Sequence, residues 1–548
     1  MEIKIAKKAG FCMGVRRAVN LVLKALNEDK TPLYTYGPLI HNPQTLELLN
    51  SLGVKILKHV NDEVQKGTCV IRAHGVPPKE MEALEKKHTV IDGTCPRVQK
   101  VQALAKRAKE QSKKVIIIGD RDHAEVKGIL GYCNGHGFVV SSYEDIEKLP
   151  PLEDYLILSQ TTQDEEVFDL LAEEILSRYP GGEVVNTICN ATEVRQSEVR
   201  RLCKECQAIV VIGGKFSANT VRLAQIARDE GKEAYLIERT EELPLEVLKR
   251  HQRVGVTAGA STPNWLINEV VDRLKSSTSN FYRAFKAFHI LAFHEALGIL
   301  LLLMALSLWI PDLRLKAALP LFAFVFFTQL FRKNAMQFLL RDTFKTYYPL
   351  KEKAISKHRG LVFGIIAISF IIALLSGFLY NPWLVLGLLF IIFIDWLLFK
   401  SPLAILGDFL FFSGLLLLLY PHWNETLIML SVSAMTSLLW CHLYKELIYL
   451  QSDGFLPKSF LILSLPLGEK KWQKLLFYGL IILVLPFLIL SFRDLTYLFL
   501  ILMLPLYGML LYLLRQRPLG QILYLESMTI FPHIWFLLLN LGIYLYRA

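Results

Sequence analysis

From residue 289 onward, the chain is built largely from apolar segments that are about as long as a bilayer is thick. An α-helix needs about 20 apolar residues to cross the hydrocarbon core. Nine such segments are found, at about 289–310, 315–331, 361–380, 382–399, 403–420, 424–442, 472–492, 495–514 and 526–546. The second half of the sequence therefore predicts an all-α polytopic membrane domain of about nine helices, residues 289–548.

Lys and Arg gather in the loops 332–360, 443–474 and 515–517. If all nine segments span, these loops lie on the same side as residue 1, and the positive-inside rule places that side in the cytoplasm. The opening MEIKIAKKAG has no apolar core of a signal peptide. We expect a multi-pass protein of the cell membrane whose first half is cytoplasmic. The net charge of +11 partly reflects these loops. No nucleic-acid module is visible, so no nucleic-acid partner is expected.

Residues 1–275 read instead as a soluble α/β domain, joined to residue 289 by a predicted linker, 276–288, that includes STSN. Strand-like runs alternate with helical patterns, which favours mostly parallel sheets. The twelve runs fall into three groups of four: EIKIA, LYTYG, GVKIL and TCVIRA; HTVID, KKVIIIG, GFVVS and YLILS; EVVNT, AIVVIGG, EAYLI and RVGVTAG. The fold predicted is three pseudo-repeated parallel-sheet modules around a central cluster.

Polar residues follow three strands of each group, and the first of them is always a cysteine. The first group gives Cys12, His41 and His74; the second gives Cys95, His123 and Thr161; the third gives Cys189, Ser217 with Asn219, and Ser261. Ligands of open α/β sheets bind beyond the carboxyl ends of strands. Three modules about a pseudo-threefold axis would therefore aim three thiols at one point, with the other side chains lining the same cavity.

Several interpretations of the cysteines are open. A cysteine taken alone is most often a small buried hydrophobe, and this is our interpretation of Cys69 and Cys133. Zinc cysteines usually come in close pairs, and the one such pair, Cys203 and Cys206, lies in a helical pattern and is read as structural, with a redox or metal role as the alternative. Three separated thiolates suit an iron–sulfur cluster better, since a fourth iron would stay open to substrate. A three-cysteine sensor is a non-enzymatic alternative.

The remaining polar residues describe an anion pocket. Histidine, serine and asparagine side chains donate hydrogen bonds, and the glycine-rich turns GGKFSANT and TAGAST can present backbone N–H groups to phosphate. Glu125, the one acid of the set, is either a proton donor in a partly desolvated pocket or a solvated surface acid. The sequence thus predicts a phosphate or diphosphate site with an acid beside it.

These motifs resemble a known family. AGFCMGVRRAV, GPLIHNP, RAHGVPP, DGTCPRV, HAEVKG, SQTT, TIC before NATEVRQ, GGKFSANT and TAGAST occur in this order over residues 1–270. They resemble the 4-hydroxy-3-methylbut-2-enyl diphosphate reductases, which perform the last step of the methylerythritol phosphate route to isoprenoids. Two positions vary from the family pattern, Phe216 and Ala218.

The resemblance implies a function for each part of the site. It implies reduction of this isoprenoid diphosphate to isopentenyl and dimethylallyl diphosphate, with electrons from ferredoxin or flavodoxin. It implies a [4Fe–4S] cluster, with the diphosphate held in the pocket and the substrate hydroxyl placed and protonated beside it. The residues implied are Cys12, Cys95 and Cys189 for the cluster, His41, His74, Ser217, Asn219 and Ser261 for the diphosphate, and Thr161 and Glu125 for the hydroxyl. His123 belongs to the same pocket and, with Glu125 and Thr161, is expected to be catalytic.

The membrane half resembles, more distantly, the intramembrane prenyltransferases of the 4-hydroxybenzoate type. SPLAILGDFLFFSG and KELIYLQSDGF followed by LSLPLGEKK support this resemblance. Those enzymes bind magnesium diphosphate with aspartate-rich loops, whereas here the loops keep only Asp342 and Glu352, then Glu446 and Asp453. Two hypotheses remain: a reductase tethered to the lipid bilayer, or a bifunctional enzyme that also transfers prenyl groups.

Overall fold

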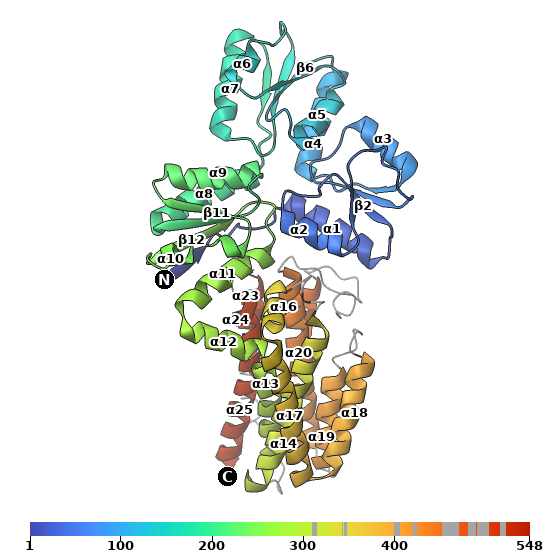
Figure 1. Ribbon diagram of the computed structural model, residues 1–548, viewed down its shortest axis with the longest axis vertical. Helices are drawn as coiled ribbons and strands as arrows, with labels where there is room; N and C mark the ends of the chain where they lie inside the picture. Colours follow the sequence, from blue (N-terminus) through green and yellow to red (C-terminus); the bar gives the residue numbers. More distant parts are fainter. Residues whose placement is uncertain are drawn as a thin grey trace. The chain divides into compact units, whose positions relative to one another are not determined.

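The computed structural model describes residues 1–309, 315–341, 344, 348–398, 406–419, 425–451, 471–479, 489, 504–515 and 522–547. The chain divides into two compact units, Met1–Thr278 and Ser279–Ala548. The helices and strands of both units are labelled in Figure 1.

The first unit contains three sheets of four parallel strands, and the twelve strands occur where the sequence predicts them. The sheet orders are β1-β12-β10-β11, β3-β2-β4-β5 and β7-β6-β8-β9. Strands such as AIVVI and YLILS are buried along their whole length, as expected of parallel strands covered on both faces. The strands are β1 Glu2–Ile5, β2 Leu33–Tyr36, β3 Lys55–Leu57, β4 Thr68–Ile71, β5 Thr89–Ile91, β6 Lys114–Ile118, β7 Gly137–Val140, β8 Tyr155–Ser159, β9 Glu183–Val185, β10 Ala208–Ile212, β11 Glu233–Ile237 and β12 Arg253–Ala258.

Helices connect the strands in the pattern of an α/β fold. They are α1 Met13–Asn27, α2 Pro43–Ser51, α3 Pro78–Lys87, α4 Pro96–Glu110, α5 Ala124–Cys133, α6 Tyr143–Ile146, α7 Glu165–Arg178, α8 Asn190–Glu205, α9 Ala218–Asp229, α10 Leu245–Leu248 and α11 Asn264–Thr278, with the 3₁₀ turn η1 at Thr240–Glu242. Several begin at side chains that accept a backbone N–H, such as Asn42 before α2 and Asp164 before α7.

The sheets do not coincide with the groups of four read in sequence order. The first strand of each group pairs with the last strand of another group: β1 with β12, β5 with β4, and β9 with β8. The helix that follows then packs on a different sheet, so that Val19 and Val22 of α1 lie in one core with Val70 of β4. Each such connection therefore crosses from one sheet to the next, which ties the three modules together.

The predicted linker, residues 276–288, is largely helical, and the boundary between the two units, Thr278 to Ser279, falls inside it. Helix α11 continues to Thr278, and α12 occupies Asn280–Ile290. Ser279 lies between them and caps α12, since its hydroxyl accepts the Tyr282 N–H at 3.0 Å. The STSN stretch thus contains the end of α11 and the N-cap of α12. N-cap positions favour the same small polar residues that suggest a linker in the sequence.

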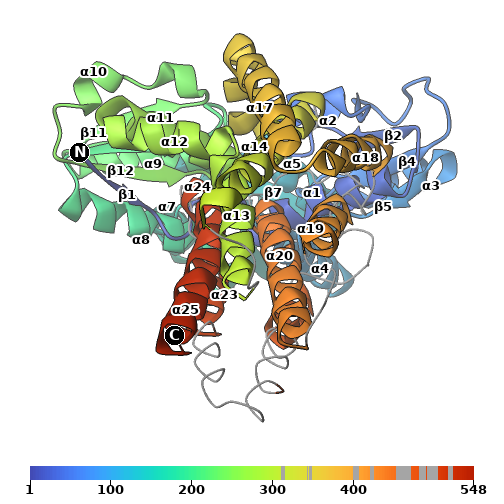
Figure 2. The ribbon, with the colours of Figure 1, turned by 90° about the horizontal axis from the view of Figure 1, so that it is seen from below.

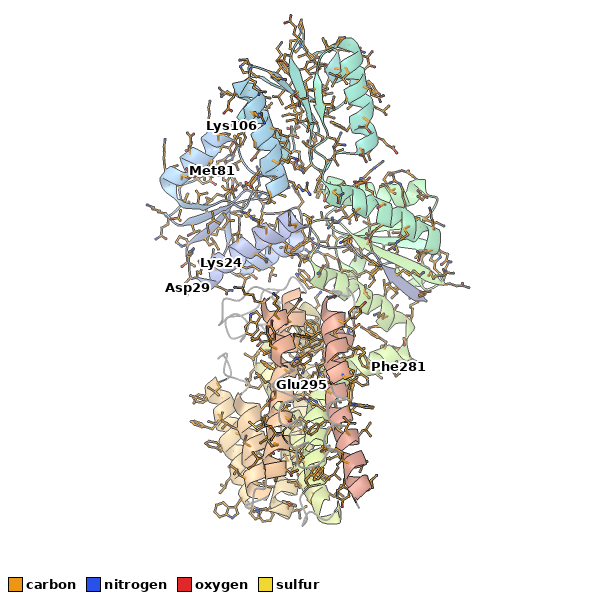
Figure 3. All side chains as sticks on the ribbon, turned by 180° about the vertical axis from the view of Figure 1, so that it is seen from behind. Lys24, Asp29, Met81, Lys106, Phe281 and Glu295 are labelled. Atoms are coloured by element: carbon orange, nitrogen blue, oxygen red, sulfur yellow. The ribbon has the colours of Figure 1, made fainter. Side chains whose placement is uncertain are left out.

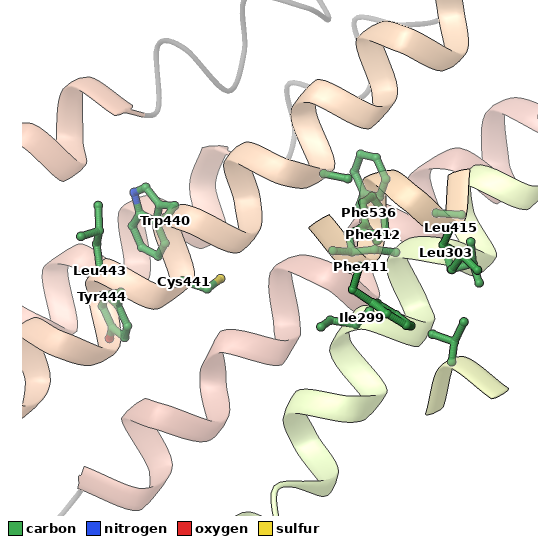
Figure 4. Close-up of a cluster of buried hydrophobic side chains, with 14 of the residues drawn as sticks. Ile299, Leu303, Phe411, Phe412, Leu415, Trp440, Cys441, Leu443, Tyr444 and Phe536 are labelled. Atoms are coloured by element: carbon green, nitrogen blue, oxygen red, sulfur yellow. The ribbon is translucent and has the colours of Figure 1, made fainter. Parts of the chain in front are cut away.

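The second unit is helical. Its described helices are α12, α13 Phe293–Ser307, α14 Leu315–Leu339, α16 Pro349–Lys357, α17 Arg359–Tyr380, α18 Trp383–Leu398, α19 Leu406–Leu419, α20 Glu425–Gln451, α23 Leu504–Arg515, α24 Ile522–Ser527 and α25 Phe531–Arg547, with the 3₁₀ turn η4 at Met528–Ile530. Figures 1 and 2 show α13 beside α25 and α20. The hydrophobic core of this unit includes Ile299, Phe411, Trp440 and Phe536, which Figure 4 labels.

Three helical stretches of the described residues are long and apolar enough to cross a membrane: Arg359–Tyr380, Thr426–Tyr449 and Leu525–Leu545. Helices α12 and α13 add a fourth if the pair, bent by 67°, counts as one span. Helices α18 and α19 have 16 and 14 described residues, and both adjoin residues outside the described part of the chain. Much of the predicted spans 472–492 and 495–514 lies outside the described residues, so the nine-span topology stays a prediction.

Candidate active site

Three cysteines occupy equivalent places in the first unit, each as the N-cap residue of a helix. Cys12 precedes α1, Cys95 precedes α4 and Cys189 precedes α8. The backbone N–H of each donates to a carbonyl just beyond the neighbouring strand of the same sheet: Ala260 at 3.0 Å, Ala73 at 2.9 Å and Thr161 at 2.7 Å respectively. One hydrogen bond is thus repeated three times, at the three connections that cross between sheets.

The three thiols lie close enough to influence one another. Burial raises the pKa of Cys95, the backbone N–H groups of Arg97 and Val98 oppose this, and the charges of Cys12 and Cys189 raise it further. A Cβ on Gly14 would lie 2.5 Å from the Cys95 Sγ, so glycine lets α1 approach that thiol. Helix N-termini stabilise thiolates. The arrangement suits a group that three thiolates bind together.

The other cysteines of the first unit differ in being buried. Cys69 and Cys133 lie in hydrophobic cores, as expected from the sequence. Cys203 and Cys206 are also packed in a core, among residues of α8 and β10. The pair is therefore part of the packing in this structure, whereas the three N-cap cysteines are only half-buried.

The three predicted histidines converge. The ring centroids of His41 and His74 are 4.9 Å apart, those of His74 and His123 are 5.2 Å apart, and those of His41 and His123 are 5.8 Å apart. Burial lowers the pKa of His41 and His74, and lowers that of His123 to about 4. At neutral pH the rings are therefore uncharged, and each offers one N–H donor.

Hydrogen bonding assigns the proton on His123. Its Nδ1 accepts the Glu125 N–H at 3.2 Å, which leaves the proton on Nε2. The His41 Nε2 and His74 Nδ1 atoms are buried without a hydrogen-bond partner. A buried polar atom without a partner costs free energy, and a bound ligand would remove that cost. Three ring nitrogens within 4.8 Å of one another could also hold a metal, but the neighbouring positive charge of Arg72 favours an anion.

Arg72, between β4 and His74, was not predicted from the sequence as a site residue. Its positive charge acts on all three histidines and contributes to their lowered pKa values. Its Nε atom is buried without a partner. A half-buried guanidinium beside three N–H donors attracts an anion rather than a cation.

The third module contacts this pocket through Ser261. The Ser261 hydroxyl donates to the His41 carbonyl at 3.0 Å. Ser217 is the N-cap residue of α9, although its side chain makes no hydrogen bond to the helix. Both amide atoms of the buried Asn219 lack a partner. Phe216 is 93% exposed, and the side chain of Ala218 lies outside the described residues. The six predicted anion-binding residues thus supply several unpartnered donors.

Glu125 is not a surface acid. It is 1% exposed, and Thr161 donates to it twice, from its backbone N–H to Oε1 at 2.6 Å and from its hydroxyl to Oε2 at 2.9 Å. Burial raises the pKa of this carboxyl to about 7, although the two hydrogen bonds oppose the shift. A carboxylic acid with this pKa holds a proton at neutral pH and can release it. Thr161 connects it to the cysteines, because its carbonyl accepts the Cys189 N–H.

Arg195 is a second site residue that was not predicted from the sequence. Its Nη2 donates to the Gly10 carbonyl at 2.8 Å and its Nη1 to the Ala191 carbonyl at 2.8 Å. These carbonyls flank Cys12 and Cys189. Burial lowers the pKa of Arg195, while the two thiols raise it. The guanidinium therefore joins two cysteine loops and places a positive charge near their sulfurs.

The carboxylates predicted for the second unit are only partly described. Glu352 accepts from the Ser356 hydroxyl at 2.6 Å, and the Glu446 Oε1 lies 3.1 Å from the His442 Nε2. Asp342 and Asp453 lie outside the described residues. The two described carboxylates, Glu352 and Glu446, thus already have side-chain partners.

The similar proteins described below cover about half of this chain. Two solved structures are similar: one of (E)-4-hydroxy-3-methyl-but-2-enyl diphosphate reductase, at 43% identity, over 50% of this chain and all of that one, with a TM-score of 0.43; and the Plasmodium falciparum E-1-hydroxy-2-methyl-but-2-enyl-4-diphosphate reductase, at 27% identity, over 50% of this chain and 88% of that one, with a TM-score of 0.47.

Curated relatives and a family model agree. The 4-hydroxy-3-methylbut-2-enyl diphosphate reductase of Geobacter sulfurreducens is 43% identical over 278 residues, 50% of this chain and 97% of that protein. The reductase of Aquifex aeolicus is 44% identical over 280 residues, 50% of this chain and 96% of that protein. The family model "LytB protein" matches residues 3–275. The chain therefore belongs to the LytB family, through a first half that is a 4-hydroxy-3-methylbut-2-enyl diphosphate reductase domain.

Proposed function

We propose that Cys12, Cys95 and Cys189 hold a [4Fe–4S] cluster, beside which the pocket reduces 4-hydroxy-3-methylbut-2-enyl diphosphate to isopentenyl and dimethylallyl diphosphate. The observation that supports this most is the threefold repeat of one hydrogen bond, from each cysteine N–H to a strand-end carbonyl. It gives three half-buried thiols equivalent places at helix N-termini. The donor set fits the cluster, since soft thiolates are its ligands and three of them leave one iron open.

When bound, the cluster supplies electrons one at a time and an open coordination position. The overall change is balanced: the substrate takes up two electrons and two protons, its C–O bond breaks, and a water molecule leaves. One proton departs with the hydroxyl oxygen and the other joins the allyl carbon skeleton at either end, which gives the two products. The electrons come from a one-electron donor of the ferredoxin or flavodoxin class.

The diphosphate binds to the donors of the histidine pocket. His41, His74 and His123 each offer an N–H, Arg72 adds a charge, and the third module adds hydroxyl and amide groups. In the absence of an anion the histidines are neutral, because burial and the Arg72 charge lower their pKa values. Bound diphosphate reverses the sign of the local charge and favours their protonation.

Glu125 supplies the proton that leaves with the hydroxyl, and Thr161 positions it. Thr161 donates to both carboxylate oxygens, so the acid has one fixed orientation. Its pKa of about 7 keeps a large protonated fraction at neutral pH. This is the property that a general acid needs at that pH.

The test of the diphosphate pocket is a comparison of kinetic constants. His41→Ala and His74→Ala remove donors to the non-reacting end of the substrate, so we expect a raised KM with kcat nearly unchanged. Reductase assays under anaerobic conditions with a chemical reductant measure both constants. Equal losses in kcat with an unchanged KM would contradict the assignment of these histidines to the diphosphate.

We propose further that the second half anchors the reductase in the cell membrane, with residues 1–275 in the cytoplasm. Large apolar side chains on α17 are exposed, among them Phe363, Ile371 and Phe378 at 63%, 54% and 66%. A contiguous exposed apolar surface on a spanning-length helix suits lipid contact. The basic loops support a cytoplasmic first half.

The alternative is a bifunctional enzyme. The resemblance to prenyltransferases favours this alternative. Against it, the Glu352 and Glu446 carboxylates already contact the side chains of Ser356 and His442. The test is the full chain in lipid nanodiscs with magnesium, a prenyl diphosphate and candidate acceptors. We expect no transfer product. Magnesium-dependent product that disappears in Asp342→Ala would establish the second activity.

A further inference from the structure

The helix that opens the second unit is broken, and the break is held by side chains. Between α12 and α13 the axis bends by 67°, and Ala292 adopts a left-handed conformation with φ of 55°. Asn334 donates to the Leu291 carbonyl at 2.8 Å. Gln337, with its amide oriented to satisfy both partners, donates to the Ile290 carbonyl at 2.8 Å. An alanine keeps a left-handed backbone conformation only where the surrounding structure fixes it. The break is therefore stabilised by the tertiary fold.

The break brings two histidines together beside a carboxylate. The rings of His289 and His294 stack at a centroid distance of 4.4 Å. The His289 Nε2 lies 2.8 Å from the Glu526 Oε2. All three side chains are almost fully buried, with exposures of 0%, 2% and 1% respectively. Each offers one ligand atom, and these atoms all lie within 4.8 Å of one another.

Both ring nitrogens of His294 are buried without a hydrogen-bond partner. The Oε1 atom of its neighbour Glu295, which Figure 3 labels, lies 3.9 Å from the His294 Nε2, too far for a hydrogen bond. A buried polar group without a partner costs free energy. The His294 ring nitrogens are therefore available to bind a ligand.

The contacts behind these side chains are those of a metal site. The His289 Nδ1 lies 2.8 Å from the Ser527 hydroxyl, which fixes the ring. The Tyr449 hydroxyl donates to the other oxygen of Glu526. Metal-binding histidines and carboxylates usually have their remaining polar atoms held in this way. The site thus has oriented ligands as well as the right ligand types.

An adjoining cavity gives access to His294. It has a volume of about 60 Å³ and is lined also by Glu295, Lys333, Lys445 and His442. Its charged groups pair with one another: Lys333 lies 2.5 Å from Asp408, and Lys445 lies 3.3 Å from Glu295. The cavity is therefore polar without a large excess of either charge, and it has room for several water molecules.

We propose that His289, His294 and Glu526 bind a zinc-class divalent transition metal in the second unit. Two imidazoles and one carboxylate form a ligand set typical of zinc sites with an open fourth position. Zn–N bonds of about 2.0–2.1 Å require ligand atoms roughly 3.3 Å apart, so binding needs small side-chain rotations at His294. Magnesium is excluded from this ligand set, because it prefers carboxylate and water oxygens. The proposal is independent of the reductase function.

The test uses the full chain, purified anaerobically in lipid nanodiscs, stripped with a chelator and then titrated with zinc alone. We expect one zinc per chain, with a zinc-edge X-ray absorption spectrum of nitrogen and oxygen ligands that includes imidazole. Glu526→Gln and His294→Ala should weaken zinc binding 10- to 100-fold or more. The matched control His442→Ala, in the same cavity but outside the ligand set, should leave binding unchanged.

The absorption spectrum of the parent protein does not depend on the folding of any variant. Sulfur ligands to zinc would place the ion at cysteines and overturn the proposal. So would the absence of stoichiometric zinc binding in the parent, or zinc binding by His294→Ala equal to that of His442→Ala.

Discussion

Replacement of Glu125 by Gln tests the acid at the centre of the site while preserving its shape. The Gln oxygen can still accept the Thr161 N–H, and its NH₂ group can donate to the Thr161 hydroxyl, so both contacts at 2.6 and 2.9 Å have a replacement. What the amide cannot do is release a proton. The variant therefore separates positioning from proton transfer.

The structure gives the size of the effect. With an ordinary pKa of 4.5, about 0.3% of a glutamic acid is protonated at pH 7, whereas with a pKa of about 7 roughly half is protonated. Burial thus increases the protonated fraction roughly a hundredfold. General acid catalysis contributes typically about 100- to 10,000-fold to a rate. We expect Glu125→Gln to lower kcat by that factor with little change in KM.

The pH dependence has a defined sign. Because the folded-state pKa is raised, the proton is present below about pH 7 and is lost as the pH rises through that value. Turnover of the parent should fall above pH 7 through loss of this group, and the residual turnover of Glu125→Gln should lack that fall. Glu125→Asp, which keeps an acid, should retain it. A variant Gln enzyme with the parent kcat, or with the parent pH profile, would refute the proton-donor role.

The remaining predictions concern the cysteines and their surroundings. Cys95→Ser should lose most of its iron and activity, whereas the buried control Cys203→Ser should retain both; iron analysis of the two variants decides this. Arg195→Gln removes a positive charge near two thiolates and should lower the cluster midpoint potential on the order of 50–100 mV, with recovery in Arg195→Lys; an unchanged potential in a redox titration followed by EPR would argue against the electrostatic role. Gly14→Ala would place a Cβ 2.5 Å from the Cys95 Sγ and should reduce cluster loading, as measured by iron and sulfide content.

The strands of the first unit could be predicted because each is a short apolar run that ends in a polar turn. Their pairing could not, because a run of apolar residues does not specify its neighbour. EIKIA opens the chain, yet β1 pairs with β12, near the end of the unit. Cys12 follows β1, at the connection that crosses to another sheet, and Cys95 and Cys189 follow β5 and β9 in the same way.

The site could be predicted where a residue type limits its chemistry, as with Cys12 or His74. Arg72 and Arg195 were not predicted because arginines are usually solvated. Only the tertiary fold shows that Arg195 is buried and that the Nε atom of Arg72 is buried too. The break at Ala292 was equally hidden, since alanine favours helix and nothing local indicates a left-handed conformation. Side chains more than 40 residues away, at Asn334 and Gln337, hold it open.

The central claim is that three matched cysteines and a buried acid form a reductase site for an isoprenoid diphosphate. The most direct test is anaerobic purification of the full chain, followed by iron and sulfide analysis and incubation with 4-hydroxy-3-methylbut-2-enyl diphosphate and a one-electron reductant. We predict a brown protein with about four irons per chain that converts the substrate to isopentenyl and dimethylallyl diphosphate. A protein fully loaded with its cluster that leaves the substrate unchanged would contradict the account.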